Sequence, residues 1–580
     1  MQELPTCMLN SPGPCVLKRV PVLILFVWLS AGSWQANAAW TALSHTNTEG
    51  VGTMLLLSDG TVMAQGSGTT ANWFRLTPDI HGSYINGTWS QLASMRYTRL
   101  YGATAVLQDG RVFFAGAEYG TGTTNAEVYD PVGNSWTSIP VPAGLIQTNN
   151  TIGSQGQNQA GFSDSGCIVL SDGKVMIAPV YPANISGIVI FDPVSNTFSS
   201  GASLINLQDE ASWVKLPDDS ILTVDQCSTT AERYIPSLNQ WVADSSCPVS
   251  LYGAGCEEGA AFLLPNGKVL FLGGTTNTAI YTPSGNNSPG SWVAGPSIPN
   301  GQAAPDAAGA MMVNGRILCA VSPQATGSPF TTPTSFYEYD YSVGAIGAFT
   351  QTTAPGSGFP PPFTLNVATF VTRMLALPNG NILFTFGSPQ LYVYQPTTGP
   401  IAAGKPTVNS VSWNADGSLH LIGTLFNGIS QGAAYGDDAQ MDSNYPIVRF
   451  VDSGGNVTYG RTFHWSSTSV MTGSRLMSTE CSVPWALFAG QGPYSLYVVA
   501  NGIASNPFAF YGPVWVDFNF GGFIHAGTYA LPYNTMASAT NAVLAGGTIV
   551  IKGTGSSSEL LSISKPMNIH SVYGPNTIGH

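Results

Sequence analysis

The sequence predicts an all-β fold made of a seven-bladed β-propeller, a following β-sandwich and a short C-terminal segment that resembles the start of a parallel β-helix. Two observations predict it. The 580 residues include 66 glycines and 40 prolines, which interrupt helices and favour short strands joined by turns. In addition, one hairpin pattern recurs seven times between Leu55 and Gly387: an apolar strand, a two-residue turn and a second apolar strand.

The seven hairpins share the chemistry of their turns. Six turns carry Asp-Gly or Asn-Gly, pairs that tolerate the positive φ angles of tight hairpins. The fourth turn carries Asp218-Asp219, so we expect a strained backbone at Asp219. The other six are Asp59-Gly60, Asp109-Gly110, Asp172-Gly173, Asn266-Gly267, Asn314-Gly315 and Asn379-Gly380.

A second pair of strands follows each hairpin. An aromatic-Asx-Pro turn such as Tyr129-Asp130-Pro131 is followed by a bulky aromatic such as Trp136. Four strands per unit, with turns 46 to 65 residues apart, are typical of kelch blades. A lone four-stranded unit cannot bury both faces, so the blades must stack around an axis. The seventh unit lacks its last strand, and we expect residues 40–43 to supply it and close the ring.

The later residues change character. Segments such as YPIVRFVD and YSLYVVANG alternate apolar and polar residues, as in an immunoglobulin-like β-sandwich. Short β runs after residue 513 are separated by Gly and Pro at about the spacing of β-helix rungs. We therefore expect a propeller over residues 39–400, a sandwich over 401–512 and a β-helix-like tail over 513–580.

Residues 1–38 have the pattern of a signal peptide. Lys18 and Arg19 precede an apolar run from Val20 to Leu29, and small residues at 36–38 suit cleavage. The run is short for a membrane span, although a retained anchor is the alternative. We expect a secreted or cell-surface protein that is not transmembrane after cleavage.

Charge and cysteine content narrow the function further. Only 8% of residues are charged, against about 25% in an average protein. A net charge of −13 without a Lys/Arg cluster argues against nucleic acid as a partner. Cleavage would leave six cysteines in an oxidising compartment, where disulfides form. Cys227, Cys247 and Cys256 lie close in sequence, and we expect one pair among them.

Acidic residues recur at one position of the repeat. Counting eight residues back from each turn Asp or Asn gives the start of each innermost strand, which lines the channel of a propeller. This position holds an acid in blades three to six, so we expect the four carboxyl groups to converge near one mouth. They could accept hydrogen bonds from neighbouring backbone, bind Ca²⁺ together, or form a glycosidase-like carboxylate pair. The acids are Asp164, Glu210, Glu258 and Asp306.

A propeller of this kind followed by an immunoglobulin-like domain resembles galactose oxidase and related copper-radical oxidases over about residues 39–512. The resemblance implies copper bound by two Tyr and two His, one Tyr being cross-linked to a Cys. Counting from the turns, Tyr101 matches the cross-linked tyrosine, although it also fits an ordinary packing residue. Val51 stands where the Cys should be, Phe370 and Val371 replace the Tyr-His pair, and Gln440 replaces the last His. Four of the five residues are missing, so we expect no copper.

The sequence therefore favours an exported, non-catalytic binding or surface protein. Its polar, weakly charged surface and many aromatic residues, with 13 Trp and 23 Tyr, suit a carbohydrate or a protein partner held by propeller loops. The alternative is a divergent carbohydrate-active enzyme or oxidoreductase of the same superfamily. Nothing in the sequence indicates an oligomeric state.

Overall fold

The computed structural model describes residues 39–118, 124–146, 151–152, 158–159, 161–163, 165–178, 187–206, 208, 211–356, 362–431, 434–435, 439–440 and 443–579. The predicted signal peptide lies outside this set. Residues 38–580 form one compact unit. Within the described part of the chain, no helix is both long enough and apolar enough to cross a membrane.

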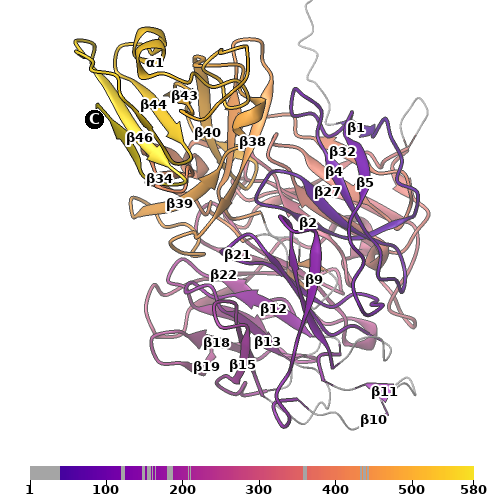
Figure 1. Cartoon of the computed structure of the whole chain (residues 1–580). Helices are drawn as coiled ribbons and strands as arrows, with labels where there is room; N and C mark the ends of the chain where they lie inside the picture. The colour runs from indigo at the N-terminus through magenta and orange to yellow at the C-terminus, as the bar shows by residue number, and fades with distance from the viewer. Residues whose placement is uncertain are drawn as a thin grey trace, which may run out of the picture. The chain divides into compact units, whose positions relative to one another are not determined.

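Seven antiparallel sheets form the blades of a propeller (Figure 1). The first four blades are β2 (Val51–Leu56), β3 (Val62–Gly66), β4 (Trp73–Thr77) and β5 (Thr88–Gln91); β6 (Ala103–Val106), β7 (Val112–Ala115), β8 (Ala126–Asp130) and β9 (Ser135–Ile139); β12 (Gly166–Val169), β13 (Val175–Ala178), β14 (Val189–Asp192) and β15 (Thr197–Ser200); β16 (Val214–Lys215), β17 (Ile221–Val224), β18 (Ala231–Ile235) and β19 (Gln240–Asp244). Along the sequence, a short hairpin of β10 (Thr151–Ile152) and β11 (Asn158–Gln159) comes between the second blade and the third blade.

The last three blades complete the ring. They are β20 (Glu258–Leu263), β21 (Val269–Gly273), β22 (Thr278–Thr282) and β23 (Ser291–Ala294); β25 (Gly309–Met311), β26 (Ile317–Pro323), β27 (Thr334–Asp340) and β28 (Ala348–Thr352), with β24 (Gln302–Ala303) and β29 (Thr364–Leu365) added; β30 (Arg373–Ala376), β31 (Ile382–Thr385), β32 (Tyr392–Gln395) and β1 (Ala39–Ala42). Single 3₁₀ turns are η1 (Ala254–Cys256), η2 (Pro299–Gly301), η3 (Thr369–Val371), η4 (Ala402–Gly404) and η5 (Trp485–Leu487).

The N-terminal strand closes the ring, as the sequence predicts. Strand β1 pairs antiparallel with β32, and Trp40 lies opposite Tyr394. The Trp40 ring packs against Phe336, Phe384 and Tyr394 at centroid distances of 5.1, 5.0 and 4.8 Å. The seventh blade is thus completed by the opposite end of the domain.

Aromatic side chains fill the spaces between adjacent blades. Phe113 of the second blade stacks on Phe191 of the third, with ring centroids 4.6 Å apart. Trp73 of the first blade meets Trp136 of the second at 5.8 Å. The aromatic residues that follow the Asx-Pro turns therefore contribute to the contacts between blades.

The hairpin turns show why Asp or Asn precedes Gly. The Gly60 amide donates to the Leu57 carbonyl, and the Asp59 carboxylate accepts the Thr61 amide at 3.0 Å. The turn glycines have φ between 77° and 90°, and Asp219 adopts a φ of 66°. The predicted left-handed backbone at Asp219 is confirmed. Among the fourteen residues of the turn pairs, however, only the second of each pair is left-handed, so each turn is a longer one closed by a left-handed residue.

Strands after residue 401 form a curled sheet that encloses a second core. They are β33 (Thr407–Trp413), β34 (Leu419–Thr424), β37 (Ile447–Val451), β38 (Val457–Phe463), β39 (Leu476–Ser482), β40 (Tyr494–Ala500), β41 (Ile503–Ala504) and β42 (Phe508–Phe510). The first half of β38 pairs with β37 and its second half with β39, so this strand passes from one layer to the other. Leu421, Phe450 and Leu496 are buried in the shared core, as expected for a β-sandwich.

The sandwich and its linker contact the hairpin turns of all seven blades. Ser469 donates to the Asp219 carboxylate at 3.0 Å, for example, and the Arg461 guanidinium donates to the Asp109 carbonyl at 3.2 Å. The innermost strands therefore begin at the other mouth of the ring, on the side away from the sandwich. In the remaining contacts, a residue of the sandwich or linker lies against a residue of a turn: Tyr459 against Gly60, Thr468 against Ser171, Met471 against Gly267, Ile401 against Val313 and Gly315, and Gly502 against Gly380.

One hairpin of the sandwich region enters the centre of the ring. It consists of β35 (Ala434–Tyr435) and β36 (Ala439–Gln440). Ala434 pairs with Ala261 of β20, the innermost strand of the fifth blade, and β36 lies beside β6 of the second blade. The two domains are thus joined through the channel as well as at the turns.

The C-terminal segment is built from parallel strands, in agreement with the predicted β-helix-like tail. Strands β43 (Val514–Val516), β44 (Gly547–Lys552) and β46 (Met567–Val572) pair in parallel, as do β45 (Gly555–Ser557) and β47 (Asn576–Ile578). Met567 pairs with Gly547, 20 residues earlier, so one rung takes about 20 residues. A short helix, α1 (Met536–Ala542), capped by Thr535, precedes β44.

Candidate functional site

A pocket of about 210 Å³ opens where the first, second and seventh blades meet. It lies at the mouth opposite the sandwich, because it is formed where β2 and β30 begin and where β3 and β31 end. We call it the mouth pocket. It is smaller than the roughly 300–1,000 Å³ that is usual for drug-sized ligands, so it suits a small one. Its lining includes Thr53, Gln65, Tyr101, Val371, Arg373 and Phe386.

Arg373 and Tyr101 place a cation and an aromatic ring in this pocket. Arg373 is only 2% exposed, and its guanidinium donates to the Thr372 carbonyl at 2.8 Å. The guanidinium carbon lies 5.0 Å from the centroid of the Tyr101 ring, within cation–π range. Tyr101 has a φ of 57°, a conformation that is uncommon for aromatic residues and is concentrated at functional sites.

Gln65 adds a hydrogen-bond acceptor. Its side-chain nitrogen donates to the carbonyls of Thr70 at 3.2 Å and Arg99 at 3.0 Å, which fixes the amide. Within the described residues, its oxygen has no partner. The Thr53 hydroxyl also lines the pocket. The Gln65 acceptor, the Thr53 hydroxyl and the rings of Tyr101 and Phe386 therefore line one small pocket.

The structure places most of the positions that match the copper ligands of the oxidases that the sequence resembles. Val51 is buried in β2, and Phe370 packs on Phe330 with ring centroids 4.7 Å apart. Val371 lines the mouth pocket together with Tyr101, so two matched positions from different blades meet there. Gln440 belongs to β36, and its side chain lies outside the described part. The absence of copper stays a prediction.

Two of the four acids of the predicted series lie within the described residues. Asp164 and Glu210 lie outside the described residues, whereas Glu258 and Asp306 are buried and their backbones are joined by a 3.0 Å hydrogen bond. Burial, with the charges of Asp225 and Glu257, holds the pKa of Glu258 well above its usual range. In the described ranges, no group of three or more His, Cys, Asp or Glu side chains could hold a metal ion. The proposed Ca²⁺ site is therefore still a prediction.

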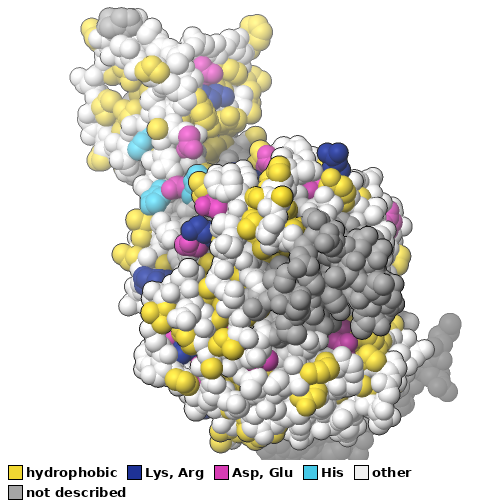
Figure 2. All heavy atoms as spheres, turned by 90° about the horizontal axis from the view of Figure 1, so that it is seen from below, with side chains coloured by type: hydrophobic (Ala, Val, Ile, Leu, Met, Phe, Trp, Pro, Cys, Tyr) yellow, Lys and Arg dark blue, Asp and Glu magenta, His cyan; other side chains and the backbone are white. Residues whose placement is uncertain are grey.

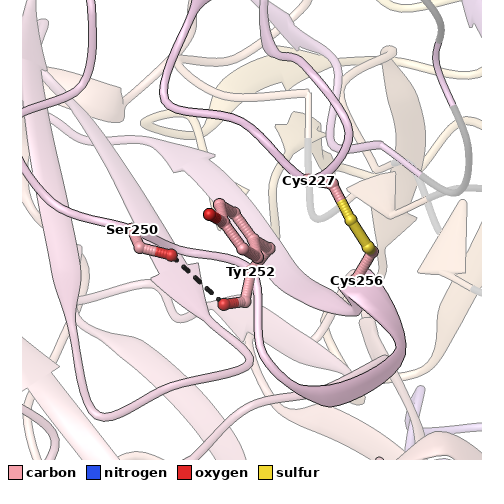
Figure 3. The surroundings of a disulfide bond; sticks show 4 residues. All are labelled: Cys227, Ser250, Tyr252 and Cys256. Carbon is pink, nitrogen blue, oxygen red and sulfur yellow. Dashed lines mark hydrogen bonds between the residues drawn. A yellow bond between two sulfur atoms is a disulfide. The ribbon is translucent and has the colours of Figure 1, made fainter.

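A disulfide joins the fourth and fifth blades near these acids. Cys227 follows β17 and bonds to Cys256, which precedes β20; Figure 3 shows this bond beside Ser250 and Tyr252. The expectation of one pair among three neighbouring cysteines is confirmed. Cys247 remains a buried thiol, and burial raises its pKa to about 11.

Sequence reasoning missed Arg373. Counting from the turn selected only the first residue of each innermost strand, and Arg373 lies two residues later than Val371. The sequence nevertheless distinguishes this residue. The whole chain holds only 18 Lys and Arg, so a cation inside an apolar strand is exceptional. On the face that Figure 2 displays, Lys and Arg side chains are scattered rather than gathered.

Comparison with known proteins gives a likeness of architecture. No protein-family model and no curated protein matches the chain. A solved fungal alcohol oxidase of the AA5 family, in complex with copper, is 15% identical over 80% of this chain and 84% of its own, with a TM-score of 0.33.

Other solved structures that the chain resembles have different names. A streptogramin B lyase is 12% identical over 62% of this chain and 98% of its own, with a TM-score of 0.40. YjhT is 14% identical over 53% of this chain and 99% of its own, with a TM-score of 0.36. These values say nothing about activity, and the seven-bladed architecture stands on the strand pairings themselves.

Proposed function

We propose that this protein is an exported, non-catalytic binding protein that recognises a carbohydrate at the mouth pocket. The observation that carries the proposal is the composition of this pocket. The aromatic residues Tyr101 and Phe386 line it together with the Gln65 acceptor and the Thr53 hydroxyl. A sugar ring offers an apolar face for stacking and hydroxyl groups that both donate and accept hydrogen bonds, so it complements each of these groups.

The position of the pocket supports the same proposal. The sandwich contacts the opposite end of the ring, so the mouth pocket is left to the loops between blades, which commonly carry binding residues. The weakly charged surface suits a neutral polymer, since only 8% of residues are charged. A protein partner at the same loops is the other outcome to be tested.

The test is to screen the purified protein on a glycan array and to titrate the retained sugar by calorimetry. Thr53→Val removes one hydroxyl at constant shape, and Phe386→Ala removes one aromatic face. Each is expected to weaken binding by roughly tenfold, the loss of about one good contact. Phe363→Ala is the control, because Phe363 is an exposed aromatic that does not line the pocket.

Two results would contradict the proposal. Equal sugar binding by all three variants would place the site elsewhere. Copper-dependent release of peroxide from a sugar or alcohol would instead identify a divergent oxidase, the alternative that Tyr101 keeps open.

A further inference from the structure

A second cavity, of about 220 Å³, lies at the junction of the propeller, the linker and the sandwich. Asn379 and Asn381 come from the turn of the seventh blade, Pro400 from the linker, and Arg449 and Gly502 from β37 and the turn after β40. We call it the junction cavity. It is separate from the mouth pocket, because it lies at the turn end of the ring.

Among the residues that the structure describes, Arg449 is the only charged side chain that lines the junction cavity. It lies opposite Tyr459 on β38 and Tyr497 on β40, and its guanidinium carbon is 4.9 Å from the centroid of the Tyr497 ring. Its Nε is buried without a hydrogen-bond partner in the described part of the chain. The guanidinium is thus positioned by two aromatic side chains and not by a carboxylate.

Two fully buried arginines of this protein, by contrast, are neutralised. Arg99 pairs with Glu127 at 3.0 Å, and Arg233 pairs with Asp244 at 3.1 Å. Among the described residues, Arg449 forms no such ion pair. Removing a guanidinium partly from water costs free energy when no anion is paired with it. An anion bound in this cavity would therefore be favourable.

A second donor faces the same space. The Asn381 backbone amide donates to the Asn379 side chain at 3.3 Å, which defines the turn. The Asn381 side-chain amide lines the cavity and forms no hydrogen bond with any residue that the structure describes. A guanidinium and an amide that line the same cavity can both donate to one group of negatively charged oxygens.

We propose that the junction cavity binds a small oxyanion, held by Arg449 and Asn381 between the propeller and the sandwich. The shared chemistry is a carboxylate, sulfate or phosphate group, either as a free ion or as the acidic group of a sugar. Bidentate hydrogen bonding by arginine suits each of these groups. Since the two donors belong to different domains, the bound anion stabilises the folded arrangement of both.

The experiment measures the unfolding temperature of the full chain, and calorimetric binding, against sodium sulfate, sodium phosphate and sodium glucuronate at matched ionic strength. A saturable rise is expected for the wild type. Arg449→Gln should weaken binding by roughly tenfold or more, because a charge-assisted hydrogen bond is lost. Arg475→Gln is the matched control, since it removes the same charge from an exposed position of the same domain.

Each outcome is decisive. Saturable binding of glucuronate alone supports the proposal with an acidic sugar as the source, and binding of sulfate or phosphate supports it with a free ion. An equal rise in wild type and Arg449→Gln reports only exclusion of salt from the surface and overturns the proposal. Should Arg449→Gln fail to fold, Asn381→Asp places a carboxylate in the cavity and must abolish binding, or the proposal is wrong. Thr53→Val, in the mouth pocket, is expected to leave this binding unchanged.

Discussion

Asp219 shows how one residue can depart from a repeat without disrupting it. It adopts the left-handed conformation that glycine takes in the six other turns, which costs about 1–2 kcal/mol for a residue with a Cβ. Its carboxylate accepts a hydrogen bond from Ser469 of the sandwich at 3.0 Å, worth about 1 kcal/mol. The side chain offsets the strain by joining the two domains.

This leads to a prediction on stability. Asp219→Ala keeps the strained backbone and loses the hydrogen bond, so the free energy of unfolding should fall by about 1–2 kcal/mol. Asp219→Gly relieves the strain while losing the same bond and should stay within about 1 kcal/mol of the wild type. Urea unfolding measures both. An alanine variant as stable as the glycine variant would contradict this account.

Glu232 should make stability depend on pH. It is fully buried in β18 and accepts the Ile205 amide at 2.8 Å; burial, together with neighbouring Asp225, raises its pKa from 4.5 to about 7. The folded state therefore holds this proton more tightly than the unfolded state. Its contribution to stability is complete below pH 4.5 and is lost as the pH rises to about 7.

The size of this effect follows from the shift in pKa. Stability should fall by about 3 kcal/mol across the window, since one pKa unit corresponds to about 1.4 kcal/mol. Glu232→Gln removes the titration and should flatten the profile of unfolding free energy measured from pH 4 to pH 8. A variant that keeps the wild-type slope would show that another group titrates there.

At the level of elements, strand β1 carries the closure of the ring. Trp40 contacts three aromatic rings of the sixth and seventh blades, and its indole nitrogen donates to the Thr353 carbonyl at 2.6 Å. Trp40→Ala should lower the free energy of unfolding by about 3 kcal/mol or more, as expected for deletion of a large packed ring. Val194→Ala, at a 93% exposed position, is the control and should change little. Equal denaturation midpoints for the two variants would mean that β1 is dispensable.

The elements also show what the sequence can and cannot predict. The seven hairpins were predictable, because each is specified by a local pattern of apolar strands around an Asp-Gly or Asn-Gly turn. Ring closure was predictable from a missing strand at one end and a spare strand at the other. The β35–β36 hairpin was not, since Ala434 pairs with Ala261 through a contact that leaves no local pattern. The length of the turns was also misjudged, because a composition of Asp-Gly fits more than one turn geometry.

At the scale of the whole molecule, only part of the candidate site could be predicted from the sequence. Counting positions correctly brings Tyr101 and Val371 into one pocket, because equivalent residues of a propeller meet at one mouth. It does not select Arg373, whose importance depends on which side of β30 faces the pocket. For the acids, the described residues establish burial of Glu258 and Asp306, and their joint role stays a prediction.

Contacts of the sandwich and its linker with all seven turns predict how the whole molecule unfolds. Ser469 and Arg461 bond to turns of different blades, and β35 adds a strand to the innermost edge of the fifth. Release of the sandwich would expose these turns together, and opening of the ring would remove the surface on which the sandwich rests. Calorimetry of residues 39–580 should therefore give one transition, with a calorimetric enthalpy equal to the van't Hoff enthalpy. Two resolved transitions would mean that the domains are stable independently and that the contacts at the turns contribute little.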